Sequence, residues 1–172
     1  YNYPDYGVSL SYQNLKNEYL GKNAALYAHY NFYFIKRNLM LRIGQGLAYT
    51  SNPYDKEDNF RNIAFGSRFM SSTYLMLNYK KERILNRFGF QAGVSFVHYS
   101  NANVKAPNTS VNTLALNAGV TYNLNEIEPD YITNKGKEEK FTEPIKYNFS
   151  LRSGINQSDV VGTAQYPFYI VS

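Results

Sequence analysis

A histidine and a serine, His98 and Ser100, stand two residues apart near the middle of the chain. On a β-strand, residues i and i+2 project from the same face. An imidazole and a hydroxyl on one face can approach each other, as a general base and its nucleophile must. The spacing therefore indicates serine–histidine chemistry if this stretch is a strand.

The residues before this pair alternate strictly, which identifies the face on which the pair lies. The even positions are apolar, and the odd positions are mostly small or polar: Phe88, Phe90, Ala92, Val94 and Phe96 against Gly89, Gln91, Gly93 and Ser95. This alternation predicts a strand over residues 88–100. His98 and Ser100 continue its apolar face.

A second alternating segment follows a polar connection. Its apolar face consists of Leu114, Leu116, Ala118, Val120, Tyr122 and Leu124. Asn112 extends this face just as His98 extends the first one. If the two segments pair as neighbouring strands, we expect Asn112 to lie near His98.

The composition favours a membrane barrel as the scaffold for these strands. The 172 residues include 18 Tyr and 11 Phe, so that 17% are aromatic. Membrane barrels place girdles of aromatic side chains at both interfaces. The sequence has no apolar run of about 18 residues, as a transmembrane helix would need. We predict an all-β fold, a closed antiparallel transmembrane β-barrel of about eight strands.

The rest of the chain divides into further alternating segments. We expect strands at residues 6–12, 24–35, 39–49, 62–79, 88–100, 113–124, 147–152 and 165–171. The stretches 36–38, 80–87 and 153–163 are interpreted as turns, and 125–142 as a solvent loop. We expect one membrane β-barrel domain over residues 1–172. Because the chain lacks an initial Met and stops inside an apolar segment, we interpret it as processed or truncated.

A family resemblance rests on several short motifs. His98-Tyr99-Ser100-Asn101 is followed by Pro107-Asn108 and by a strand ending Gly119-Val120-Thr121-Tyr122; upstream stand Tyr3-Pro4, Tyr6-Gly7, Gly46-Leu47-Ala48-Tyr49, Asn52-Pro53-Tyr54-Asp55 and Gly66-Ser67. Together these motifs, over roughly residues 3–124, resemble the lipid A 3-O-deacylase family (PagL-like, also called acyloxyacyl hydrolase-like).

The resemblance implies an eight-stranded barrel in the bacterial outer membrane, with an esterase site that faces the lipid. It implies Ser100 as the nucleophile and His98 as the general base. It also implies an oxyanion hole formed by the main-chain amide near Asn103, where the family usually has Gly, and by the Asn108 side chain. The family has an acidic residue where this chain has Asn112. An amide oxygen can accept the imidazole N–H but brings no negative charge to the imidazolium.

Three functions follow from these observations. The first is an outer-membrane hydrolase that removes acyl chains from lipid A of lipopolysaccharide, or from a related membrane lipid. The second is a non-catalytic barrel subunit of a larger outer-membrane complex that retains an inherited H-x-S-N motif, and the neutral Asn112 supports it. The third, a soluble lipocalin-like barrel, would need its apolar faces to point inward, where Gly and Ser offer little lining.

The net charge, the lack of cysteine and the remaining polar residues exclude some kinds of chemistry. The net charge of +5 suits the phosphates of lipid A, but it equally suits ordinary solubility, and no nucleic-acid motif is present. The chain has no cysteine, which excludes disulfides and cysteine catalysis. His29 and Arg42 lie on polar faces and are expected inside the barrel. Asp55, Glu57 and Asp58 are weak evidence for calcium, and we expect no metal and no cofactor.

Overall fold

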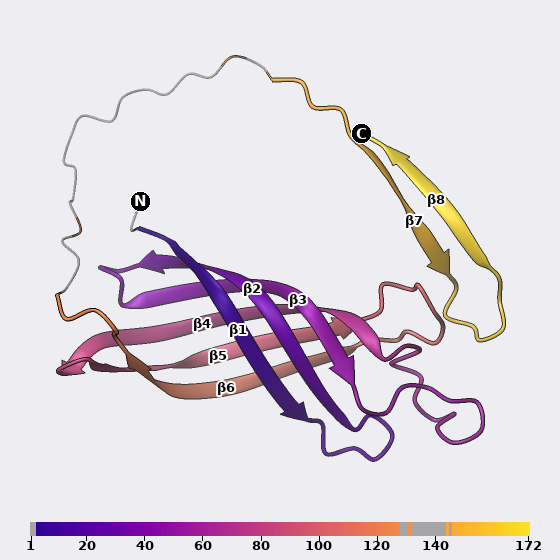
Figure 1. Cartoon of the computed structure of the whole chain (residues 1–172), viewed down its shortest axis with the longest axis horizontal. Coiled ribbons are helices and arrows are strands. Elements are labelled where there is room, and N and C mark those ends of the chain that lie inside the picture. Colours follow the sequence, from indigo (N-terminus) through magenta and orange to yellow (C-terminus); the bar gives the residue numbers. More distant parts are fainter. Residues whose placement is uncertain (1–2, 128–130, 132–143, 145) are drawn as a thin grey trace.

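The computed structural model describes residues 3–127, 131, 144 and 146–172, and these form two antiparallel sheets (Figure 1). The strands are β1 (Asp5–Asn14), β2 (Lys22–Phe34), β3 (Leu39–Thr50), β4 (Phe69–Leu85), β5 (Phe88–Ser100), β6 (Val111–Tyr122), β7 (Leu151–Gln157) and β8 (Gln165–Val171). β1 to β6 pair in sequence order as one curled sheet, and β7 and β8 form a separate hairpin. The all-β prediction is confirmed.

The two faces of the large sheet follow the alternation of the sequence. On β5, Phe88, Phe90 and Val94 are 49%, 45% and 41% exposed. The intervening Gly89 is buried, and Gln91 is partly buried. The predicted parity of β5 is therefore confirmed, with the apolar residues outward. β1 shows the same division, because Tyr6, Val8, Leu10 and Tyr12 are exposed at its even positions.

Two strand boundaries were predicted wrongly. β4 begins at Phe69 rather than at residue 62, because the buried Asn62 side chain accepts hydrogen bonds from the main-chain N–H groups of Ala64 and Phe65, both at 3.0 Å. These bonds form a local turn in place of a sheet ladder. β4 also continues to Leu85, through residues expected to be a turn, with a register shift between Lys81 and Leu85.

The last segments also differ from the prediction. β7 covers Leu151–Gln157, so most of it falls in the stretch 153–163 that was expected to turn. Gly, Asn and Ser in this stretch favour turns locally, but pairing with β8 along the whole of β7 makes it a strand. β8 agrees with its predicted range. Most of the predicted solvent loop at 125–142 falls outside the described residues.

The large sheet is open between β1 and β6 in the described part of the chain, and the hairpin pairs with neither edge strand (Figure 1). The two edges nevertheless approach each other through side chains at one end. Gln13 on β1 donates from Nε2 to Oγ1 of Thr113 on β6, at 2.9 Å, and accepts a hydrogen bond from the Tyr99 hydroxyl at 3.0 Å. The curl of the sheet thus brings its first and last strands within reach of each other.

The concave face of the sheet is closed at this end by a plug of side chains. Phe65, from the connection between β3 and β4, is fully buried against Tyr27 and Tyr99, which are each 1% exposed. The expected interior residues lie on the same face. Arg42 donates from Nε to the Asn31 Oδ1 atom at 2.7 Å, and Asn31 in turn donates to Asp5.

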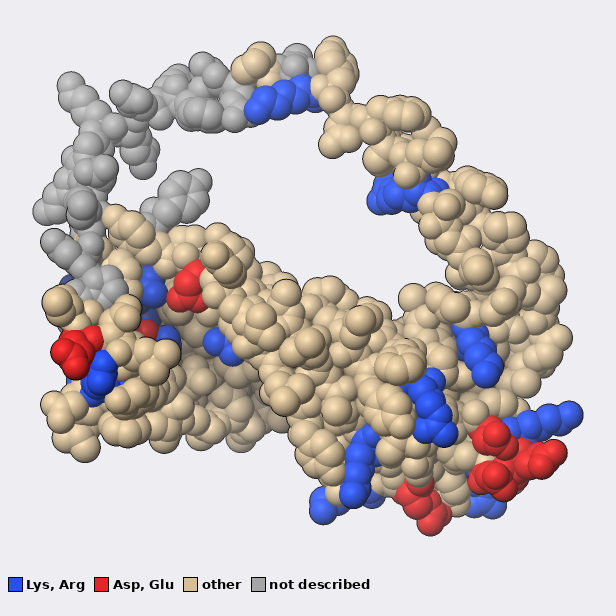
Figure 2. Space-filling model, in the orientation of Figure 1, with Lys and Arg blue, Asp and Glu red and all other residues tan. Residues whose placement is uncertain are grey.

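The connections differ in length between the two ends of the sheet. Residues 15–21, 51–68 and 101–110 join strands at one end, which we call the loop end; residues 35–38 and 86–87 make short turns at the other. Figure 2 shows Lys, Arg, Asp and Glu mostly toward these two ends of the sheet, with a surface largely free of them between. Among the described residues, no helix is long and apolar enough to cross a bilayer.

Candidate functional site

His98 and Asn112 face each other across β5 and β6, where they are direct register partners. The His98 Nδ1 atom lies 2.6 Å from the Asn112 Oδ1 atom. Because an amide oxygen only accepts, His98 must donate its Nδ1 proton in this contact. The Nε2 atom is then the basic nitrogen, which is the tautomer that a general base for a neighbouring hydroxyl needs.

Ser100 is the last residue of β5 and shares the outward face of His98. Its Oγ atom accepts hydrogen bonds from Asn108 Nδ2 at 2.9 Å and from the main-chain N–H of Ala102 at 3.0 Å. No hydrogen bond joins Ser100 to His98 among the residues that the structure describes. The hydroxyl instead bonds with residues of the 101–110 connection.

The connection between β5 and β6 bends tightly behind Ser100. Ala102 and Asn103 adopt left-handed backbone conformations, with φ of 55° and 56°. Asn enters this region more easily than most residues that carry a Cβ, which suits position 103. Ala102 has no side chain that favours it, so the surrounding contacts must hold the bend.

Asn108 is at the centre of those contacts. Besides Ser100, it accepts from the main-chain N–H of Asn101 at 3.0 Å and donates to the Asn103 Oδ1 atom at 2.6 Å. Its Nδ2 donor and the Ala102 N–H therefore converge on the Ser100 hydroxyl. Of the two donors predicted for an oxyanion, the structure brings the Asn108 side chain to Ser100, and the nearest main-chain donor is that of Ala102, one residue before Asn103.

The turn end of the β7–β8 hairpin contacts this connection, and sequence reasoning missed it. Gln157 donates its main-chain N–H to the Asn103 carbonyl at 2.7 Å and accepts from the Ala106 N–H through Oε1 at 2.8 Å. Gln165 donates to the Val104 carbonyl at 2.6 Å. A glutamine in a Gly-, Asn- and Ser-rich stretch gives no local sign of such pairing.

The concave side of the sheet supports the site from behind. Ser72 on β4 donates its hydroxyl to the His98 carbonyl at 3.0 Å and lies 2.8 Å from the hydroxyl of the buried Tyr27. Since both side chains are buried, these bonds fix the backbone of β5 beneath the imidazole. The outward face alone is left for a substrate.

The other residues considered from the sequence lie away from this pair. His29 is on the concave face, with its Nδ1 atom 2.7 Å from the Ser9 hydroxyl, as expected of an interior histidine. Asp55 accepts from the main-chain N–H groups of Glu57 and Asp58, which hold the pKa of its carboxyl below the ordinary range. No three His, Cys, Asp or Glu side chains gather into a metal-binding group in the described part of the chain.

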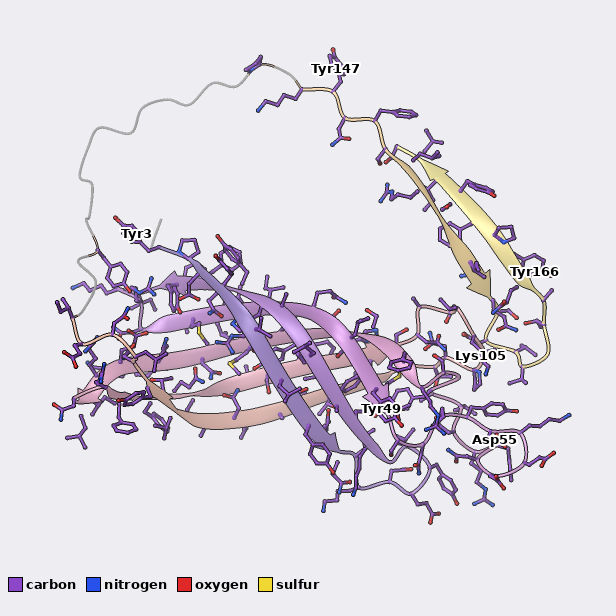
Figure 3. All side chains as sticks on the ribbon, in the orientation of Figure 1. Tyr3, Tyr49, Asp55, Lys105, Tyr147 and Tyr166 are labelled. Atoms are coloured by element: carbon purple, nitrogen blue, oxygen red, sulfur yellow. The ribbon has the colours of Figure 1, made fainter. Side chains whose placement is uncertain are left out.

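The long connections form a polar rim around the loop end. Figure 3 shows Lys105 between the sheet and the turn of the hairpin, with Asp55 on the neighbouring connection. An open cleft of about 470 Å³ lies between the 15–21 and 51–68 connections, with Glu18, Asp58 and Arg68 among its walls. Charges of both signs therefore line this cleft, whereas the side chains of the site itself are neutral amides, a hydroxyl and an imidazole.

One protein-family model matches most of the chain. Residues 1–121 match the family model described as lipid A 3-O-deacylase (PagL), which covers β1 to β5 and nearly all of β6. No curated protein and no solved structure matches the chain. The match extends over more than two thirds of the sequence and includes every residue of the H-x-S-N motif. The chain therefore belongs to the lipid A 3-O-deacylase (PagL) family.

Proposed function

We propose that this chain is an outer-membrane serine esterase that removes an ester-linked acyl chain from lipid A. The observation on which this rests is the His98–Asn112 contact of 2.6 Å on the outward face, beside Ser100. The contact selects the histidine tautomer that a serine hydrolase requires. In the proposed setting, the outward face that carries the pair would meet the acyl chains of a bilayer.

In the proposed reaction, the Ser100 Oγ atom attacks the ester carbonyl while His98 Nε2 takes the hydroxyl proton. Asn108 Nδ2 and a main-chain N–H of residues 102–103 donate hydrogen bonds to the oxyanion that forms. Collapse of this intermediate breaks the ester bond, and His98 returns the proton to the departing sugar oxygen. Water then hydrolyses the acyl-serine by the same route, in which Asn112 holds the imidazole in place.

The proposed setting is the bacterial outer membrane, with the loop end on the outside, because such barrels have long outer loops and short periplasmic turns. We propose that residues 1–172 make one closed eight-stranded barrel domain, in which the β7–β8 hairpin lies between β6 and β1. The outward faces of β1 to β6 are mainly apolar, which suits a lipid boundary. Closure of the barrel would provide hydrogen-bond partners for the unpaired main-chain groups of the edge strands β1 and β6. The alternative, a non-catalytic subunit of a larger complex, has no support in the comparisons.

Hydrolysis of purified lipid A in detergent tests the proposal. Mass spectrometry should detect a product lacking one acyl chain together with the free fatty acid. Ser100→Ala should abolish both, whereas Ser158→Ala, which removes an exposed hydroxyl of the hairpin turn, should not. A product that forms equally with Ser100→Ala would refute the serine mechanism.

A further inference from the structure

Six polar side chains other than Tyr project outward from β3 to β6 near the loop end, and we call them the outer polar patch: Gln45, Ser71, Thr73, His98, Ser100 and Asn112. They fall into two adjacent rows of register partners. Gln45, Thr73, His98 and Asn112 form one row, and Ser71 and Ser100 belong to the next. The mechanism above uses only the half of the patch on β5 and β6.

The β3–β4 half of the patch consists of Gln45, Ser71 and Thr73. These residues do not mark the end of the apolar outward face, because apolar residues lie on both sides of them. On the side away from the loops, the next outward residues are apolar, Ile43 on β3 and Leu75 on β4. On the loop side, Leu47 is 72% exposed and Phe69 is 71% exposed, so the outward face becomes apolar again. Polar groups between two apolar rows of a lipid-facing surface need a partner of their own.

These three side chains satisfy one another only in part. Gln45 donates from Nε2 to the Ser71 hydroxyl at 2.8 Å and accepts from the Thr73 hydroxyl at 2.7 Å. One Gln45 N–H and the Ser71 hydroxyl proton have no acceptor among the described residues. The group therefore presents two hydrogen-bond donors to whatever lies against the outer face.

An apolar groove lies on the loop side of these residues and reaches Leu47 and Phe69, the neighbours of Ser71. It has a volume of about 260 Å³ and lies along β1 to β4, with Leu10, Leu26, Leu47, Ala24, Tyr49 and Phe69 among its walls. Leu47 is the register partner of Ser71, which is in turn the partner of Ser100. Since neighbouring strands are about 4.8 Å apart, Ser71 lies about 5 Å and Leu47 about 10 Å from the Ser100 backbone along this row.

We propose that Gln45, Ser71 and Thr73 form a binding subsite for a second acyl linkage of the lipid whose ester is cleaved at Ser100. Their donors bind the carbonyl or hydroxyl oxygens of that linkage, and the neighbouring groove takes its hydrocarbon chain. The assignment rests on the proposed function, because it needs a lipid with more than one acyl linkage at Ser100. The subsite is specific for neutral acceptors, since no Lys or Arg belongs to it and a phosphate would lack a counter-charge there.

Lipid binding tests this subsite without any need for turnover. The Ser100→Ala chain in detergent would be titrated against fluorescently labelled lipid A, with anisotropy as the readout. Gln45→Leu combined with Thr73→Val should raise Kd about 10-fold, which corresponds to the loss of about one net hydrogen bond, that of the free Gln45 N–H. These substitutions add apolar surface to a lipid-facing position, so the sheet should still fold.

Matched controls separate the subsite from a general effect on the membrane surface. Thr73→Ser keeps the hydroxyl and should bind as the parent chain does, and so should Leu116→Ala, on the outward face of β6. Affinity for dodecyl phosphate, which has no acyl linkage, should not change. An unchanged Kd for lipid A in the double variant, or an equal loss for dodecyl phosphate, would overturn the proposal. Lipid A that binds to wild type but is not hydrolysed would refute the esterase alone.

Discussion

Replacement of Asn112 by Asp should make the proposed esterase faster. The side chain is nearly isosteric, so a carboxylate oxygen would take the position of Oδ1, now 2.6 Å from His98 Nδ1. During attack the imidazole becomes a cation, whose charge centre is about 4 Å from that carboxylate. At an effective dielectric constant of about 20 to 40, the attraction is about 2–4 kcal/mol.

Because about 1.4 kcal/mol corresponds to a factor of ten in rate, we expect kcat to rise by roughly 10²-fold. The gain should lie below the approximately 10⁴-fold loss that the reverse change causes in a buried serine-protease triad, since Asn112 is exposed to its surroundings. Asn112→Glu, one methylene longer, should give a smaller rise if it reaches the ring. A carboxylate on a barrel face near the interface costs little in folding.

The assay is hydrolysis of lipid A in detergent by wild type, Asn112→Asp and the double variant with Ser100→Ala. The rise must disappear in the double variant, because the carboxylate acts only through His98 and the Ser100 hydroxyl. An unchanged rate in Asn112→Asp would refute the reasoning, and so would a rise that survives the loss of Ser100.

Three further predictions concern the segments that hold the site. Gln157→Leu removes the acceptor of the Ala106 N–H. Hydrogen exchange at that amide should therefore accelerate at least about 5-fold, and lipid A hydrolysis should fall. Gln157→Glu keeps an acceptor oxygen and should return the exchange rate toward that of wild type. Asn62→Ala leaves the buried main-chain N–H groups of Ala64 and Phe65 without their acceptor, and should lower the free energy of unfolding by about 2–4 kcal/mol. Urea unfolding measures this loss, and an unchanged urea midpoint would contradict it. Hydrogen bonds from the main-chain N–H groups of Asp58 and Glu57 lower the pKa of the Asp55 carboxyl, so this turn is formed above the ordinary carboxyl range and loses these bonds as pH falls through the lowered pKa. In an NMR titration, the Asp58 and Glu57 amide signals should therefore shift with a midpoint below the ordinary pKa of a carboxyl group.

The sequence was informative where structure follows from alternation. The outward direction of Phe88 and Phe90 needs only the period of two and an apolar exterior. The approach of Asn112 to His98 needed one further assumption, that consecutive alternating segments pair, and the observed register joins the two residues directly. Their catalytic roles remain predictions.

The parts that failed depend on side chains that interact far along the chain. Asn62 starts a turn because its amide reaches two following N–H groups, an outcome that no apolar period reports. Gln157 contacts the connection at Asn103 and Ala106, about fifty residues away, so neither residue indicates the other. The alternation pattern gives Gln45 no special place, because its position matters only as part of a row across four strands.

The proposed site carries no formal charge, which explains how the proposed esterase could work with the neutral Asn112. With a neutral imidazole, none of the six side chains of the outer polar patch is ionised, so the whole patch can face lipid with hydrogen bonds as its only requirement. A carboxylate would accelerate proton transfer and, near the interface, would add only a small cost in folding. The Asn108 and Ala102 donors at Ser100 act independently of that choice, and in serine hydrolases such donors keep part of the rate when a triad member is missing. Asn112 should therefore lower the rate without abolishing ester cleavage, and the size of the increase with Asn112→Asp measures how much rate the neutral site gives up.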